Sequence, residues 1–186
     1  MAEDTKRTIT QLIHEQHELI ESMFDQLDTT RDEGERVELF DCLRATLAVH
    51  EAAEEELVHP TVRRMGDGAA AAVDARLEEE STAKRVLADL EKLGPNGEGF
   101  DELFATFQGA VVEHAEAEEA ELFPFLETLD VEERRHLAEL FESAEQMAPT
   151  HPHPHGPESA LGNMLVGPFV GMIDRVRDAL RNRKAA

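Results

Sequence analysis

Two copies of one short motif combine imidazole and carboxylate side chains at helical spacing. The first copy reads His50-Glu51-Ala52-Ala53-Glu54-Glu55, the second reads His114-Ala115-Glu116-Ala117-Glu118-Glu119, and each has a proline ten positions after its histidine. Residues four apart lie one turn apart on one helix face, so the paired His and Glu can reach one metal ion or two adjacent ions. Imidazole and carboxylate ligands without thiolate favour iron, manganese or zinc.

Two more residues of these types interrupt apolar helical series. His17 lies between Ile13 and Ile20, and Glu80 lies three residues after Leu77. Counted from turns expected near residues 33 and 96, both fall at the height of the motif residues, in a layer about one turn thick at 1.5 Å per residue. The sequence therefore predicts one buried set of metal ligands, comprising His17, His50, Glu54, Glu80, His114 and Glu118.

Three inward carboxylates in one layer need a positive partner. A buried carboxylate is strongly destabilising unless it is paired or bound to a metal, and no inward Lys or Arg is expected at this height. Two metal ions satisfy the layer if Glu54 and Glu118 bridge them, the three histidines are terminal ligands and Glu80 completes the second ion. The alternative is a purely structural bundle with ordinary core histidines.

The elements that must position these residues are four amphipathic helical stretches. They cover residues 5–29, a second stretch after the break at 32–34, a third between the glycines at 66–68 and Gly94, and a fourth from Phe100. Short breaks between such stretches predict an all-α, up-down-up-down four-helix bundle. A short fifth helix is expected after the N-cap Asp130, with Leu137, Leu140 and Phe141 facing inward.

The end of the chain differs in composition from the bundle. We expect one domain over residues 1–146 and an extension over 147–186, which contains a Pro/His-rich extended segment and a basic C-terminal tail. Alternating prolines exclude a helix around His151, His153 and His155. These histidines either bind metal or form a polar loop, and the basic tail either packs on the acidic bundle or binds a partner.

The charge and composition exclude several function classes. The 186 residues contain 18 Lys and Arg against 41 Asp and Glu, a net charge of −23, which argues against nucleic acid and anionic membranes as partners. The single cysteine, Cys42, cannot form an internal disulfide and is expected to be inert packing. No apolar run is long enough to span a membrane and the first residues do not resemble a signal peptide, so a cytoplasmic location is expected.

The paired motifs resemble those of the hemerythrin-like, or HHE cation-binding, family, and the resemblance covers residues 5–128. His17, His50 with Glu54, and His114 with Glu118 match the family's ligand pattern, whereas Glu80 stands where the family has a third-helix histidine. The resemblance implies two non-haem iron ions, bridged by carboxylates and an oxo or hydroxo group, that bind or react with O₂, hydrogen peroxide or NO. Zinc or manganese could substitute for iron.

The extra carboxylate favours redox chemistry over reversible O₂ carriage, because added negative charge stabilises the ferric state. We therefore expect chemistry on peroxide or O₂, with catalase-like peroxide decomposition as its enzymatic form. The alternatives are a sensor of O₂, NO or iron that signals to a partner without turnover, and a metal store.

Position suggests roles for several further residues. His59 is expected at a helix-end surface, or else as a hydrogen-bond partner or gate beside the centre. Glu55 and Glu119 are expected on solvated faces, or else as groups that hold the ligands from outside. His14 and His136 are expected on the surface.

Overall fold

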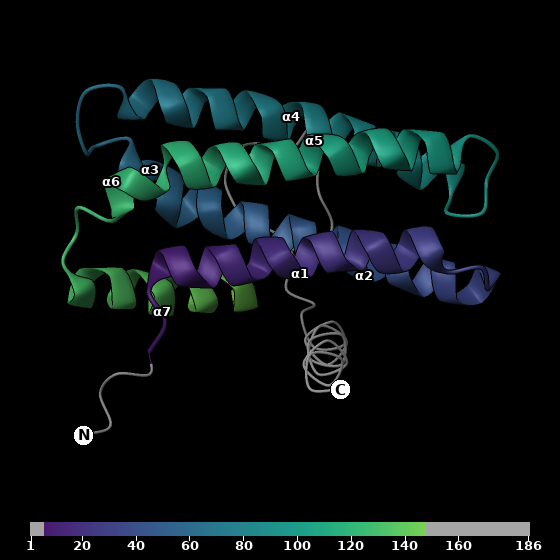
Figure 1. Cartoon of the computed structure of the whole chain (residues 1–186), viewed down its shortest axis with the longest axis horizontal. Coiled ribbons are helices and arrows are strands. Elements are labelled where there is room, and N and C mark those ends of the chain that lie inside the picture. The colour runs from purple at the N-terminus through teal and green to yellow at the C-terminus, as the bar shows by residue number, and fades with distance from the viewer. Residues whose placement is uncertain (1–5, 148–186) are drawn as a thin grey trace.

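The computed structural model describes residues 6–147, which form helices joined by short turns (Figure 1). The four long helices are α1 (Ile9–Thr29), α2 (Glu33–Ala53), α4 (Ala69–Leu93) and α5 (Phe100–Glu121). The shorter elements are η1 (Glu54–Val58), α3 (His59–Val62), α6 (Phe123–Leu126) and α7 (Val131–Met147). The extension from residue 148 onward, with its three histidines and its basic tail, lies outside the described residues.

The long helices form the predicted antiparallel bundle. In Figure 1 the α1–α2 and α4–α5 turns lie at one end, and α3 and α6 lie at the other. Helix α1 packs against α2 and α5, and α4 packs against α5. The fifth helix, α7, has 17 residues and packs along α1 and α2. The all-α bundle with an added helix is therefore confirmed.

Local sequence explains where these helices begin. The carboxylate of Asp32 accepts a hydrogen bond from the backbone N–H of Glu35 at 2.9 Å, and Asp130 accepts one from Glu133 at 2.9 Å. Both are the aspartate N-caps that such positions favour. Gly68 and Gly99 precede α4 and α5 with φ values of 87° and 83°, in the region that favours glycine.

One buried arginine ties the two hairpin turns together. The Arg36 guanidinium donates to the carbonyl of Pro95 at 2.7 Å and to that of Leu27 at 3.3 Å, and it pairs with Asp101 at 2.5 Å. These bonds join the α1–α2 turn to the start of α5. They fix the relative height of the two hairpins, on which the alignment of the polar layer depends.

The apolar core has two parts. One part lies toward the hairpin turns and contains Phe24, which contacts Phe104 and Phe107 at ring-centroid distances of 5.2 and 5.6 Å. The other part lies at the opposite end and includes Ile13, Val62 and residues of α7. Within α7 the inner residues are Leu137, Ala138 and Phe141. The prediction for Leu140 was wrong, since its side chain is 42% exposed.

No helix within residues 6–147 combines the length and the apolar composition that a membrane crossing requires.

The structure predicts that Cys42 is unreactive in the folded protein. Its side chain is 2% exposed, and burial raises the pKa of the thiol, so less thiolate forms at a given pH than in free cysteine. An aromatic disulfide reagent should label the native protein slowly and the denatured protein fast. A Cys42→Ala, Ala105→Cys variant, whose thiol lies on an exposed face of α5, should react fast in both states. Equally fast labelling of native wild type would contradict the prediction.

Candidate metal centre

All six predicted side chains meet in one buried layer between the two parts of the core. His17 comes from α1, His50 from α2, Glu54 from η1 and Glu80 from α4, while α5 supplies His114 and Glu118. Glu54 and Glu118 are 0% exposed, and Glu80 is 2% exposed. Such deep burial of three carboxylates requires compensation.

The first set of ligand atoms joins the two hairpins. His17, His50, Glu54 and Glu118 each offer a nitrogen or oxygen atom within 4.8 Å of the others. Nε2 of His17 lies 3.5 Å from a Glu118 oxygen, and Nε2 of His50 lies 3.4 Å from a Glu54 oxygen. These gaps are long for hydrogen bonds, but two ligands about 2.1 Å from one ion lie roughly 3.0–3.4 Å apart.

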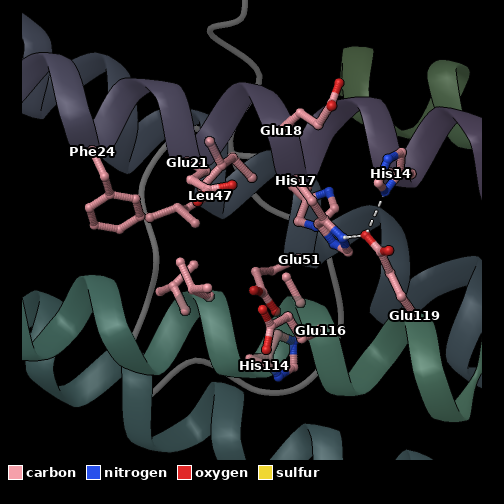
Figure 2. Close-up of a pocket in the computed structure, with 15 residues that line it drawn as sticks. His14, His17, Glu18, Glu21, Phe24, Leu47, Glu51, His114, Glu116 and Glu119 are labelled. Atoms are coloured by element: carbon pink, nitrogen blue, oxygen red, sulfur yellow. Dashed lines mark hydrogen bonds and ion pairs between the residues drawn. The ribbon is translucent and has the colours of Figure 1, made fainter.

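The second set contains a residue that the sequence analysis missed. Glu51, Glu80 and His114 offer atoms within 4.8 Å of one another. Figure 2 shows Glu51 between α1 and α5 on the side of His114. The sequence contains one signal for Glu51: the second motif copy has Ala115 at the position where the first has Glu51.

The polar atoms of this layer fit a cation. Both oxygens of Glu54, Glu80 and Glu118, and Nε2 of His17 and His114, are buried without a hydrogen-bond partner among the described residues. Buried polar atoms are normally satisfied, so a cluster of orphaned oxygen and nitrogen acceptors indicates an absent positive partner. The donors are those that iron, manganese or zinc accept.

The three predicted histidines are oriented from outside the layer. Nδ1 of His17 donates to Glu119 at 2.9 Å, and Nδ1 of His114 donates to Glu79 at 2.9 Å. Nδ1 of His50 donates to the Gln16 amide oxygen at 2.8 Å. Each bond leaves Nε2 facing inward, the arrangement that fixes metal-binding imidazoles in proteins.

Glu119 therefore holds the predicted ligand His17 from outside, the second of the two roles expected for it, and its side chain is 30% exposed. Its carboxylate also accepts from His14 at 2.9 Å, and Figure 2 shows both bonds converging on it. His14 itself is exposed, as expected. Hydrogen bonds and charge from His17 and His14 outweigh partial burial and lower the pKa of Glu119. Only the packing of α1 against α5 brings these side chains together.

A lysine reaches the layer, contrary to the prediction that no cation lies at this height. Nζ of Lys84 lies 3.6 Å from a Glu80 oxygen and is also paired with Glu55. Glu55 is thus an ion-pair partner and not simply a solvated residue. Lys84 is one turn after Glu80 on α4, a spacing typical of helical ion pairs. It offsets one of the negative charges in the layer.

His59 is buried at 3% exposure, so the prediction of a surface position was wrong. The cause is the π-helical turn η1, in which the His59 N–H donates to the Glu54 carbonyl five residues earlier. A regular α-helix would pair residues four apart and would turn His59 away from Glu54. The extra residue in the turn brings His59 to the face of Glu54, and π-turns of this kind are frequent at functional sites.

The layer has strongly shifted protonation equilibria. Burial and neighbouring carboxylates raise the pKa of Glu54 well above its usual range, and burial with the charge of Glu51 raises that of Glu80 to about 12. Burial also lowers the pKa of His50 to about 3. For Glu118, the neighbouring imidazoles of His17 and His59 outweigh burial and lower the pKa. A metal ion binds deprotonated ligands and therefore displaces protons from this cluster.

A cavity of about 180 Å³ leads from the surface to the layer (Figure 2). Its inner wall includes His17, His50 and His114 beside the apolar side chains of Phe24 and Leu47. Carboxylates surround it toward the surface, namely Glu18, Glu21, Glu116 and Glu119. The cavity could admit a molecule of a few atoms to the ligand set.

Residues 8–126 match the model of the hemerythrin HHE cation-binding domain. The chain belongs to this family. It therefore binds metal cations, which in hemerythrin domains are typically iron.

Known proteins resemble this chain to different extents. The hemerythrin-like chain is 27% identical over 178 residues to an uncharacterised hemerythrin-like protein of Schizosaccharomyces pombe, covering 92% of this chain and 86% of that protein. It is 28% identical over 116 residues to a DNA nickase of Nostoc, covering 62% of this chain but only 32% of that protein. Its fold is similar to that of an HHE domain protein from Mycobacterium kansasii, known from a crystal structure. The TM-score is 0.67 and the identity 20%, and the match covers 75% of this chain and 85% of that one.

The outer hydrogen bond to His17 predicts a specific effect on metal affinity. Glu119→Ala should weaken binding of Fe²⁺ by about 10–100-fold, because the His17 ring loses the bond that orients it. Glu116→Ala removes another carboxylate from the same cavity edge, one that is not hydrogen-bonded to a histidine among the described residues, and should change affinity much less. Competition with a chelator measures both. Equal loss in the two variants would mean that only the charge of the cavity edge matters.

The raised pKa of Glu80 predicts how the metal-free protein responds to pH. Between its unfolded value near 4.5 and its folded value of about 12, the folded chain binds one more proton than the unfolded chain. The free energy of unfolding should therefore fall as pH rises, by up to about 1.4 kcal/mol per unit for this group.

Glu80→Gln should remove that dependence and make the metal-free protein more stable than wild type, increasingly so between about pH 6 and pH 9. Glu78→Gln, on the exposed face of α4, should leave the pH dependence of the free energy of unfolding unchanged. Urea unfolding of the metal-free proteins measures the difference. A Glu80→Gln variant that is less stable than wild type across this range would contradict the assignment.

Proposed function

We propose that this hemerythrin-like protein holds two iron ions and uses them for redox chemistry on hydrogen peroxide or O₂. His17 and His50 would hold one ion, and Glu80, His114 and Glu51 would hold the other. Glu54 and Glu118 would bridge the two. This assignment keeps the six residues predicted from sequence and adds Glu51.

The observation that most supports two ions is the pair of adjoining ligand sets. One set offers four donor residues and the other offers three, and all of them lie in one layer across the bundle. A single ion of this kind accepts four to six ligands, so seven donors with several orphaned atoms exceed what one ion needs.

The charge of the layer favours redox chemistry over reversible O₂ binding. When bound, a pair of iron ions can exchange two electrons with peroxide or O₂. Four carboxylates face three histidines across the two sets, and Lys84 neutralises only part of that charge. Anionic ligands stabilise the more highly charged metal. The chain has no Tyr and no Trp, so it has no phenol or indole to relay single electrons away from the layer.

The protein's own side chains would control access and orientation. The cavity between α1 and α5 ends at the histidines, and Phe24 and Leu47 give part of its wall an apolar surface. O₂, peroxide and NO are small and uncharged enough to pass such a wall. The carboxylates around the cavity would disfavour anions and attract metal cations during loading.

A sensor of O₂, NO or iron is the second candidate, because α7 contacts a proposed ligand. The Gln16 amide bonds to His50 and also donates to Glu145 of α7 at 2.8 Å. The ring of Phe141, also on α7, lies 6.3 Å from the ring of His50. Movement of His50 on ligand binding would therefore reach α7, and a partner could read the position of that helix.

Metal analysis combined with a peroxide assay tests both candidates. Full-length protein loaded anaerobically with Fe²⁺ should hold two irons per chain and evolve O₂ steadily from peroxide. His50→Ala and His114→Ala should lose turnover and at least one iron, because each removes a terminal ligand. His136→Ala is the matched control, since that imidazole lies on α7 with its side chain 70% exposed.

The other results separate the hypotheses. A single tightly bound zinc per chain after anaerobic, iron-supplemented expression would overturn the di-iron assignment. Two irons without turnover, but with a ligand-dependent change in hydrodynamic radius, would favour the sensor. Because the protein lacks Tyr and Trp, its weak near-ultraviolet absorption leaves the iron-dependent bands visible in either case.

A further inference from the structure

His59 is the one imidazole of the buried layer that is not held from outside among the described residues. Nδ1 and Nε2 of His59 are both buried and have no hydrogen-bond partner there. The other three buried histidines each bond through Nδ1 to Glu119, Gln16 or Glu79. A neutral core histidine normally satisfies at least one ring nitrogen, so ordinary packing does not explain His59.

His59 lies beside Glu80 of the second set of ligands. Its Nε2 lies 3.5 Å from Oε1 of Glu80 and 3.7 Å from Oε1 of Glu118. The other oxygen of Glu118, Oε2, lies 3.5 Å from Nε2 of His17. Glu118 thus has one oxygen facing His17, on the side of the first set, and the other facing His59, on the side of Glu80.

Building on the di-iron function proposed above, we propose that His59 is a ligand of the second metal ion, through Nε2. The two hairpins are related by the sequence repeat, and Glu80 of the second hairpin stands 63 positions after His17 of the first. The second ion would otherwise have one imidazole, His114, against two for the first. His59 supplies the imidazole that α4 lacks, and each ion then has two.

The π-turn is the structural device that makes this possible. It is confined to the first motif, whereas in the second motif α5 ends at Glu121 and the Leu122 N–H bonds to Glu118 four residues earlier. The residue at the matching position there is Phe123, which cannot bind a metal. The π-turn and His59 therefore occur together in the first motif copy, and in the proposed site both serve the second ion.

A hydrogen bond from His59 to Glu80 or Glu118 is the competing explanation. The N···O separations of 3.5 and 3.7 Å exceed those of normal hydrogen bonds, which fall near 2.7–3.2 Å. They are closer to the spacing of ligands on a shared ion. Glutamine keeps a hydrogen-bond donor without an imidazole, so it separates the two explanations.

Metal binding by full-length His59 variants tests the proposal. Metal-free protein is titrated with Co²⁺, whose visible ligand-field bands report coordination, and Fe²⁺ and Co²⁺ per chain are measured after gel filtration with a chelator. Wild type should retain two ions. His59→Gln, His59→Phe and His59→Ala should retain the first ion but bind the second more weakly, by more than the roughly 10–100-fold that loss of an outer hydrogen bond causes. Free imidazole should restore the second ion in His59→Ala.

The retained first ion serves as an internal check of folding, and His136→Ala controls for loss of a histidine elsewhere. Wild type with two ions, together with a His59→Gln variant of unchanged second-ion affinity and spectrum, would overturn the role of His59 alone. So would a failure of imidazole to rescue His59→Ala while the first ion stays bound. Wild type that holds fewer than two ions would instead overturn the di-iron function.

Discussion

The burial of three carboxylates at one height is the constraint on which the rest of the structure depends. Glu54, Glu80 and Glu118 are almost completely removed from water and have no hydrogen-bond partners among the described residues. Without a cation, burial forces protons onto Glu54 and Glu80. The fold therefore contains a layer that is unfavourable by itself, and apolar clusters on both sides supply the stability that tolerates it.

This constraint explains why so many polar contacts surround the layer. Glu119 and Glu79 each hold one histidine by its outer nitrogen, and Arg76 in turn pairs with Glu79 at 2.8 Å. Lys84 brings a positive charge to the edge of Glu80. These contacts neutralise only part of the charge of the centre. They orient donors whose inner atoms stay available, which is what a site built for metal requires and a structural core does not.

Much of the fold could be predicted because periodicity and turn residues act locally. The breaks at 66–68 and at Gly94 and the cap at Asp130 all lie where expected. Counting along straight helices also brought His17 and His114 to one height. The π-turn could not be predicted, because no local sequence pattern marks the extra residue in that helical turn. The predicted surface position of His59 was wrong for this reason. The partners of Glu119 depend on which helices pack together, information that one helical stretch does not contain. The contact between Lys84 and Glu80, by contrast, lies within α4 at a spacing of four residues and was open to prediction.

The added helix α7 follows from the same reasoning. A four-helix bundle leaves the groove between α1 and α2 exposed beside His50, where a buried imidazole would meet water. Helix α7 packs along both helices, and Phe141 covers the His50 ring. Glu145 then fixes Gln16, whose amide oxygen fixes the tautomer of His50. Because an amide oxygen can only accept, and because burial lowers the pKa of His50 and keeps its ring neutral, His50 presents an unprotonated Nε2 to the layer. Helix α7 thereby helps to determine which atom of His50 faces Glu54.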